Sequence, residues 1–95
     1  MTKLEQKLIE LGYVLDNVEY YKNEPLFSKY EKYFKHCRIV ASVCHKVENQ
    51  CDSYNLYVKA DTDSFAIKVF LDSLQIAFNE MQKDLEELKK CQEQN

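Results

Sequence analysis

The sequence has few of the residues that bend or break a chain. Its 95 residues include one glycine, one proline and no tryptophan. Glycine-rich phosphate-binding loops are excluded, because Gly12 stands alone. No apolar run approaches the roughly 20 residues of a membrane span, and the first residues lack the apolar core of a signal peptide. We therefore expect a cytoplasmic protein with no membrane association, whose four cysteines are reduced.

Charge and hydrophobicity are those of a folded chain. The formal net charge is -3, with 45% hydrophobic and 31% charged residues. Such a composition favours a folded domain over disorder, and the acidic balance gives no global attraction to nucleic acid. The length predicts one domain over residues 1–95.

Residues 2–11 have the pattern of a short helix. Thr2 and Glu5 have the spacing of a capping box. Leu4, Leu8 and Leu11 form one apolar stripe. Gly12 follows where a C-terminal cap belongs, so we expect the helix to end there.

Residues 13–60 predict an antiparallel sheet. We expect a strand from Tyr13 to Tyr21 with an irregularity at Asp16–Asn17, a turn at Asn23–Glu24–Pro25, and a second strand from Ser28 to Phe34. Alternation is clearest at 37–47, where one parity is more apolar and predicted to face the core, and it returns at 53–60 across a short loop. The inward sets are Cys37, Ile39, Ala41, Val43, His45 and Val47, followed by Tyr54, Leu56, Val58 and Ala60.

A long helix is predicted over about 63–91, with no proline or glycine to interrupt it. The expected fold class is α+β: an N-terminal helix, a meander of three or four antiparallel strands, and a long C-terminal helix packed on the sheet. The helix carries apolar residues at alternating steps of four and three, which is an a/d seam. The seam comprises Ile67, Leu71, Leu74, Phe78, Met81, Leu85 and Leu88.

The end of that seam favours a second copy of the chain. The N-terminal helix is too short to cover the long helix, so Phe78, Met81, Leu85 and Leu88 are candidate self-association residues. A homodimer is favoured over a monomer, as a short antiparallel helix pair. The same residues support an alternative function, a self-assembling structural protein.

The stretch 36–45, which begins His-Cys and ends Cys-His, raises the question of a metal site. In a strand, Cys37 and Cys44 face opposite sides. Cys37 and His45 share a side but lie about 26 Å apart at ~3.3 Å per residue. Zinc requires about four converging ligands, so we predict packing cysteines, no metal and no cofactor.

Basic and aromatic residues interleave from Lys29 to Arg38, as on platforms that bind single-stranded nucleic acid. Strand parity mixes the two kinds on each face, so a protected sheet edge is the favoured interpretation. Nucleic-acid or nucleotide binding remains an alternative. Its candidate residues are Lys29, Lys32, Lys35 and Arg38.

Three stretches carry a resemblance: residues 3–13, 30–36 and 74–88. Together they resemble small, mostly uncharacterised proteins encoded by phages and prophages of Gram-positive bacteria. The resemblance implies a setting in which small acidic proteins bind a host protein, such as a defence nuclease or a replication factor. It carries no catalytic or binding residue over to this chain.

We therefore expect a non-enzymatic binding protein that inhibits or modulates a host protein, in the manner of an anti-CRISPR protein. No catalytic signature is present in the sequence. Tyrosine is enriched at protein interfaces, and acidic residues lie near several tyrosines. The predicted partner-binding residues are Tyr20, Tyr21, Tyr30, Tyr33, Tyr57, Glu19, Glu24 and Glu31.

Overall fold

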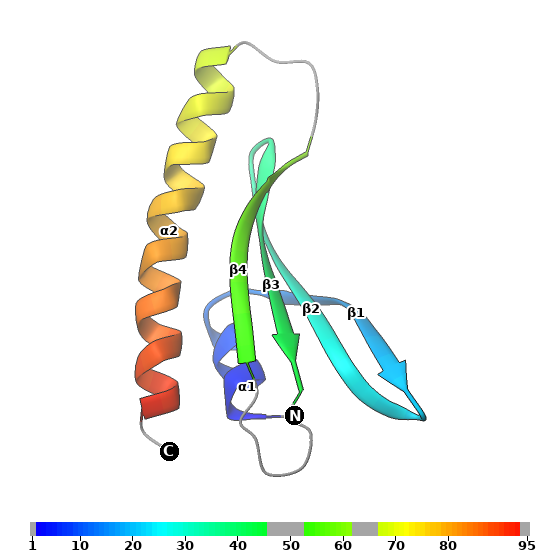
Figure 1. Cartoon of the computed structure of the whole chain (residues 1–95). Coiled ribbons are helices and arrows are strands. Elements are labelled where there is room, and N and C mark those ends of the chain that lie inside the picture. Colours follow the sequence, from blue (N-terminus) through cyan, green and yellow to red (C-terminus); the bar gives the residue numbers. More distant parts are fainter. Residues whose placement is uncertain (1, 46–52, 62–66, 94–95) are drawn as a thin grey trace.

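The computed structural model describes residues 2–45, 53–61 and 67–93. Its elements follow in the order α1, four strands and α2, which is the predicted α+β arrangement (Figure 1). The bounds are α1 Lys3–Glu10, β1 Val14–Tyr21, β2 Glu24–Phe34, β3 Cys37–Cys44, β4 Ser53–Ala60 and α2 Ile67–Glu93. The strands form one antiparallel sheet in the order β1-β2-β3-β4. Over the described residues, neither helix has the length and hydropathy needed to cross a membrane.

Helix α1 begins and ends as its sequence predicts. The Thr2 side chain accepts a hydrogen bond from the Glu5 backbone N–H, and the Glu5 side chain returns to the Thr2 backbone. Gly12 has a φ of 101°, a left-handed conformation that glycine adopts without steric cost. The capping box and this glycine fix both ends of the helix before any packing is considered.

The first hairpin differs from the prediction at its turn. Lys22 and Asn23 have positive φ values of 51° and 67°, so they form the turn, and β2 begins at Glu24. The prediction that Glu24 and Pro25 form the turn was wrong: Pro25 pairs with Tyr20, beyond the part of β2 that pairs with β3. An edge position tolerates proline because its missing N–H breaks no central ladder. The predicted irregularity at Asp16–Asn17 is confirmed by a register shift between Leu15 and Asn17.

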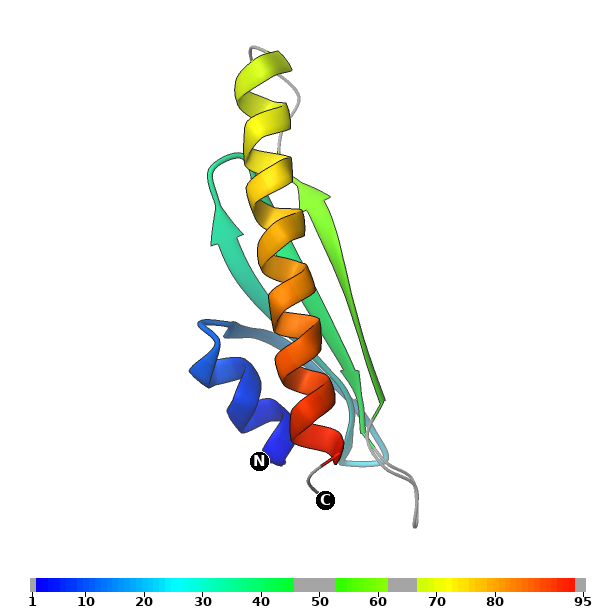
Figure 2. The same ribbon diagram turned by 90° about the vertical axis from the view of Figure 1, so that its left-hand side faces the viewer.

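Both helices lie on one face of the sheet, as Figure 2 shows. We call this the covered face. Strand β3 turns Cys37, Ile39, Ala41 and Val43 toward it, and all four are fully buried, which confirms the predicted parity. His45 follows β3, and Val47 lies outside the described residues, as do positions 63–66 of the predicted helix. The core comprises these residues with Leu4, Leu8, Tyr13, Tyr30, Ala77, Met81 and Leu88.

The buried stripe of helix α2 coincides with the predicted seam only in part. Among the side chains that the structure describes in α2, Ser73, Ala77, Met81, Asp84 and Leu88 are buried, while Leu71 and Phe78 are exposed. Buried Ser73 and Asp84 do not look apolar in the sequence, which is why a purely hydrophobic pattern missed this face. Met81 and Leu88 lie in the core and Leu85 packs against it, so of the four predicted self-association residues only Phe78 is exposed, and the seam as predicted is not free for a second copy.

Candidate functional site

The face of the sheet opposite α1 and α2 carries no described helix or strand, and we call it the open face. Strand register brings the side chains of one row together across all four strands: Val14, Glu31, Val40 and Tyr57. The adjacent row joins Tyr33, Arg38 and Lys59. Strand parity thus places residues from distant parts of the sequence on one surface.

Large apolar side chains are exposed at two places on this open face, with Tyr20 and Phe27 toward one end of the strands and Val14, Tyr33 and Tyr57 toward the other. Its exposed apolar residues are between 38% and 65% exposed. They are Val14, Tyr20, Phe27, Tyr33 and Tyr57. Exposed large apolar side chains on one face of a folded chain are typical of an interaction site, and tyrosine is enriched in such sites because its ring is apolar and its hydroxyl polar.

The centre of the open face is tied together by charge. Arg38 Nη1 donates to Glu31 Oε2 at 3.0 Å, and Arg38 Nε lies 3.1 Å from Asp61 Oδ1. The Tyr33 hydroxyl also donates to Glu31. Desolvation opposes the charge on Arg38, but Glu31 and Asp61 outweigh it, so the Arg38 pKa is raised. The network holds Tyr33 in place, and Val40 between Glu31 and Tyr57 is only 1% exposed.

A shallow hollow of about 260 Å³ lies on the same open face. It is lined by Asn17, Glu19, Phe27, Lys29 and Ser42, which come from β1, β2 and β3. Two of its lining residues, Asn17 and Glu19, lie next to the register shifts of β1. A partner's side chain inserted there would meet one aromatic ring and polar groups of both signs.

The structure brings only part of the predicted partner surface together. Tyr20, Tyr33, Tyr57 and Glu19 share the open face, whereas Tyr21 pairs with Glu24 at the tip of the first hairpin with its side chain on the other side. Tyr30 is 1% exposed and Glu31 is buried, so including them as contact residues was wrong. Phe27 and Val14 were missed. Extending β2 back to Glu24 in the sequence would have placed Phe27 in phase with Tyr33.

Tyr30 lies on the covered face instead, where it contacts α1. Its hydroxyl donates to Glu5 Oε2 at 2.5 Å and so ties β2 to α1. Burial, and then the hydrogen bond to Glu5, raise the Tyr30 pKa. Burial disfavours the Glu5 carboxylate, but the hydrogen bonds from Tyr30 and Thr2 and the nearby His45 outweigh it, so the Glu5 pKa is lowered.

The basic residues predicted for nucleic acid do not form a strip. Lys32 lies on the covered face, with Nζ 2.7 Å from Asp84 Oδ2 and 3.3 Å from Glu80 Oε1. Arg38 is paired on the open face with Glu31 and Asp61. Because a phosphate backbone requires several cations that are free to pair with it, this arrangement gives the nucleic-acid alternative no geometric support.

Three polar side chains under α1 have the order of a hydrolase triad. Ser28 Oγ lies 2.6 Å from His45 Nε2, and His45 Nδ1 lies 4.0 Å from Glu5 Oε1. A nucleophile must reach its substrate, and the acid must orient the histidine by a hydrogen bond. Ser28 is 2% exposed, and the separation of 4.0 Å exceeds a hydrogen bond. The geometry therefore favours an internal network that fastens α1 to the sheet.

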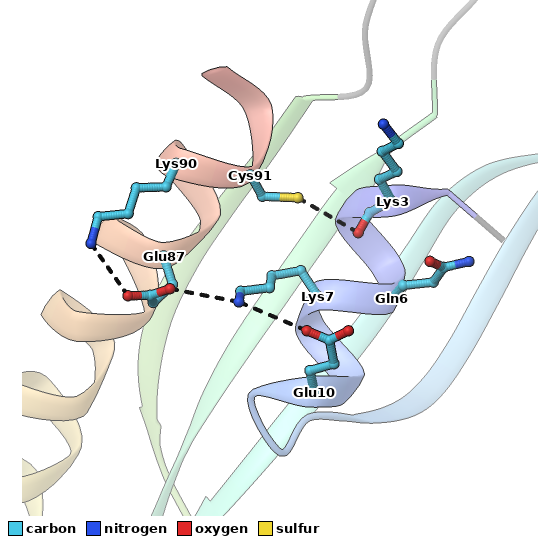
Figure 3. A pocket seen from close by; sticks show the side chains of 7 residues that line it. All are labelled: Lys3, Gln6, Lys7, Glu10, Glu87, Lys90 and Cys91. Atoms are coloured by element: carbon cyan, nitrogen blue, oxygen red, sulfur yellow. Dashed lines mark hydrogen bonds and ion pairs between the residues drawn. The ribbon is translucent and has the colours of Figure 1, made fainter. Parts of the chain in front are cut away.

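A second hollow, of about 420 Å³, lies between α1 and α2 (Figure 3). Its charged residues are paired: Lys7 Nζ lies 3.6 Å from Glu87 and 3.8 Å from Glu10, and Lys90 Nζ lies 3.5 Å from Glu87. Cys91 Sγ reaches the Lys3 carbonyl at 3.8 Å. These contacts describe a polar junction between two helices, and they leave the open face as the stronger candidate for binding.

Cys37 and His45 lie at opposite ends of β3. Cys37 Sγ contacts the Ser73 carbonyl, and His45 contacts Ser28. Over residues 2–45, 53–61 and 67–93, no three histidine, cysteine or acidic side chains come together in a way that could hold a metal ion.

Comparisons with known proteins found no relative of this chain. No family model matches the chain, and neither a curated protein nor a solved structure does.

Proposed function

We propose that the chain acts by binding another protein through its open face, and not by catalysis. The observation that carries the proposal is the group of exposed aromatic side chains on a sheet face that no described element covers. The charged network of Glu31, Arg38 and Asp61 supports it, since a fixed polar centre among aromatic anchors pre-organises a contact surface.

The resemblance to phage-encoded proteins suggests where the partner belongs. We propose a host protein of a Gram-positive bacterium, whose activity the chain inhibits or modulates by occupying a surface. A chemically matched partner would offer apolar side chains to Tyr20, Phe27, Tyr33 and Tyr57. It would also need polar groups opposite Glu19 and Lys29, which line the hollow.

The test has two stages. Tagged protein is first incubated with a bacterial lysate, with and without nuclease, and the retained proteins are identified by mass spectrometry. The affinity of each purified candidate is then measured by calorimetry for the native chain and for Phe27→Ala and Tyr33→Ala. Each substitution should weaken binding about thirtyfold, as truncation of an interface anchor does.

Tyr21→Ala is the matched control, because Tyr21 is 62% exposed but lies at the hairpin tip on the other side. It should leave the affinity unchanged. If Tyr21→Ala abolished binding while the two open-face variants did not, the binding surface would be elsewhere. Retention of nucleic acid alone, lost on nuclease treatment, would favour the nucleic-acid alternative.

A further inference from the structure

The two edges of the sheet differ in how well they are protected against pairing. Edge strand β1 contains two register shifts and the acidic residues Asp16 and Glu19, all of which discourage a further strand. Edge strand β4 pairs with β3 over eight residues without a shift, and Lys59 is its single charged residue. In the described part of the chain, β4 pairs with β3 alone. Its outer edge is therefore a regular template for another strand.

The backbone groups on that outer edge can be assigned from one hydrogen bond. The Asp61 N–H donates to the His36 carbonyl at 3.0 Å, so Asp61 points its backbone toward β3. Backbone direction alternates along an antiparallel strand. Lys59, Tyr57 and Asn55 therefore also point toward β3. The outer edge then presents the N–H and C=O groups of Tyr54, Leu56, Val58 and Ala60.

Helix α2 overhangs this edge with apolar side chains. Glu80 pairs with Lys32 of β2, and Glu87 pairs with Lys7 of α1, so this flank of α2 faces away from β4. By helical spacing, Leu71 and Phe78 lie on the other flank, beside β4. They are 55% and 45% exposed. Figure 2 shows the same arrangement, with α1 on one side of α2 and β4 along the other.

We infer that the occupant of this edge is a second copy of the chain. The two β4 strands pair antiparallel about a two-fold axis perpendicular to the sheet, so that both pairs of helices lie on one face. In the assigned register, Leu56 pairs with Val58 of the second copy and Tyr54 with Ala60. All the outward backbone groups then find partners, and Tyr57 meets Tyr57 of the second copy at the axis.

The spacing of strands favours a second copy over an unrelated strand. Helix α2 packs on β3 and β4, which places it about one strand spacing from the two-fold axis. With strands ~4.8 Å apart, the two α2 axes lie about 10 Å apart. Packed helices are typically ~8–10 Å apart. Sheet pairing therefore brings the two α2 helices into direct contact along their apolar flanks.

Phe78 lies close to the axis in this arrangement. Cys37 pairs with Ala60 and contacts the Ser73 carbonyl at 3.6 Å, so Ser73 lies at the level of Ala60. Helix α2 runs opposite to β4 (Figure 1). Tyr57 lies about 10 Å from Ala60 toward the start of β4, at ~3.3 Å per residue. Because α2 runs in that direction, it covers the same distance in about seven residues at ~1.5 Å each. The axis therefore passes near residue 80, and Phe78 is the apolar residue beside it.

The assigned register places no two charges of the same sign opposite each other. Lys59 faces Asn55 of the second copy, so no like charges are opposed across the strands. The dimer also joins two open faces edge to edge, with the two Tyr57 side chains at the join. This inference does not rest on the proposed function. A monomer that binds a host protein, and a dimer that binds none, are distinguishable results.

Analytical ultracentrifugation over a wide concentration range tests the interface. The native chain should reach twice its monomer mass, and Phe78→Lys should weaken self-association about thirtyfold. Ile76→Lys is the matched control, since Ile76 is 59% exposed on the other flank of α2. It should leave the association unchanged. A monomer at every concentration, or greater sensitivity to Ile76→Lys, would overturn the proposal.

Cross-linking tests the register independently of folding yield. In a chain with Cys44, Cys51 and Cys91 replaced by serine, Tyr57→Cys should form an intermolecular disulfide on mild oxidation. Lys59→Cys should not, because Lys59 faces Asn55 of the second copy. A disulfide from Lys59→Cys alone, or from neither variant, would overturn the assigned pairing. Circular dichroism establishes that each variant is folded.

Discussion

The two faces of the sheet are made from alternate residues of the same strands, yet they differ in what protects them. On the covered face, Ile39 and Ala41 are fully buried in a core shared with residues of α1 and α2. On the open face, Val40 is equally buried, but it lies between the side chains of Glu31 and Tyr57. The covered face therefore depends on packing between elements. On the open face, neighbouring side chains of the same sheet cover Val40, while the aromatic side chains of Tyr33 and Tyr57 stay exposed.

The largest loss of stability is expected from a substitution at Asp84, on the covered face. Its carboxylate accepts hydrogen bonds from Tyr13 and Lys32, both at 2.7 Å, beneath α2. Asp84→Ala leaves the Lys32 charge without its closest partner, and removing one member of such a pair costs about 3–5 kcal/mol of unfolding free energy. Urea denaturation measures this loss. Asp72→Ala, at an exposed site on the same helix, should change stability little; equal losses would refute the role of burial.

Adjacent residues on opposite faces test whether the two faces are packed equally tightly. Ile39→Ala should cost about 3 kcal/mol, because the helices above it cannot collapse into the cavity. Val40→Ala should cost about 1.5 kcal/mol, near the transfer term for two lost carbons, since flexible side chains on the open face can settle over the gap. Thermal and urea denaturation of both variants provide the measurement. A larger loss for Val40→Ala would show that the open face is packed as tightly as the covered one.

A third effect depends on pH and concerns Tyr30 and Glu5. Tyr30→Phe removes a hydrogen bond to a buried carboxylate and should cost about 2 kcal/mol at neutral pH. The folded state lowers the Glu5 pKa below its ordinary value of 4.5. The stabilisation is therefore fully present above that value and lost as the pH falls through the folded pKa.

Urea denaturation from pH 7 to pH 3 provides this measurement. The stability difference between the native chain and Tyr30→Phe should shrink at low pH, and Tyr20→Phe at an exposed site on the open face is the control. A difference independent of pH would separate Tyr30 from the ionisation of Glu5.

Much of the fold was predictable because its signals are local. The capping box, the glycine after α1, the alternation in β3 and β4 and the irregularity in β1 each depend on neighbours in the sequence. The partner surface was predictable only in part. Tyr30 and Tyr33 are three residues apart on one strand, and their parity indicates that they face opposite sides. Parity alone does not indicate which side the helices cover.

The sequence by itself determined the order of the elements, the two ends of α1 and which side chains of a strand share a face, because capping and strand alternation are set by short-range geometry. Tertiary structure alone decided that Tyr30 is buried and Tyr33 exposed, and that buried Ser73 and Asp84 join Ala77 and Leu88 in the packed stripe of α2. The physical reason is that burial depends on which element lies above a residue. A buried polar group is stable only when a distant partner, such as Lys32 or Tyr13 for Asp84, satisfies it.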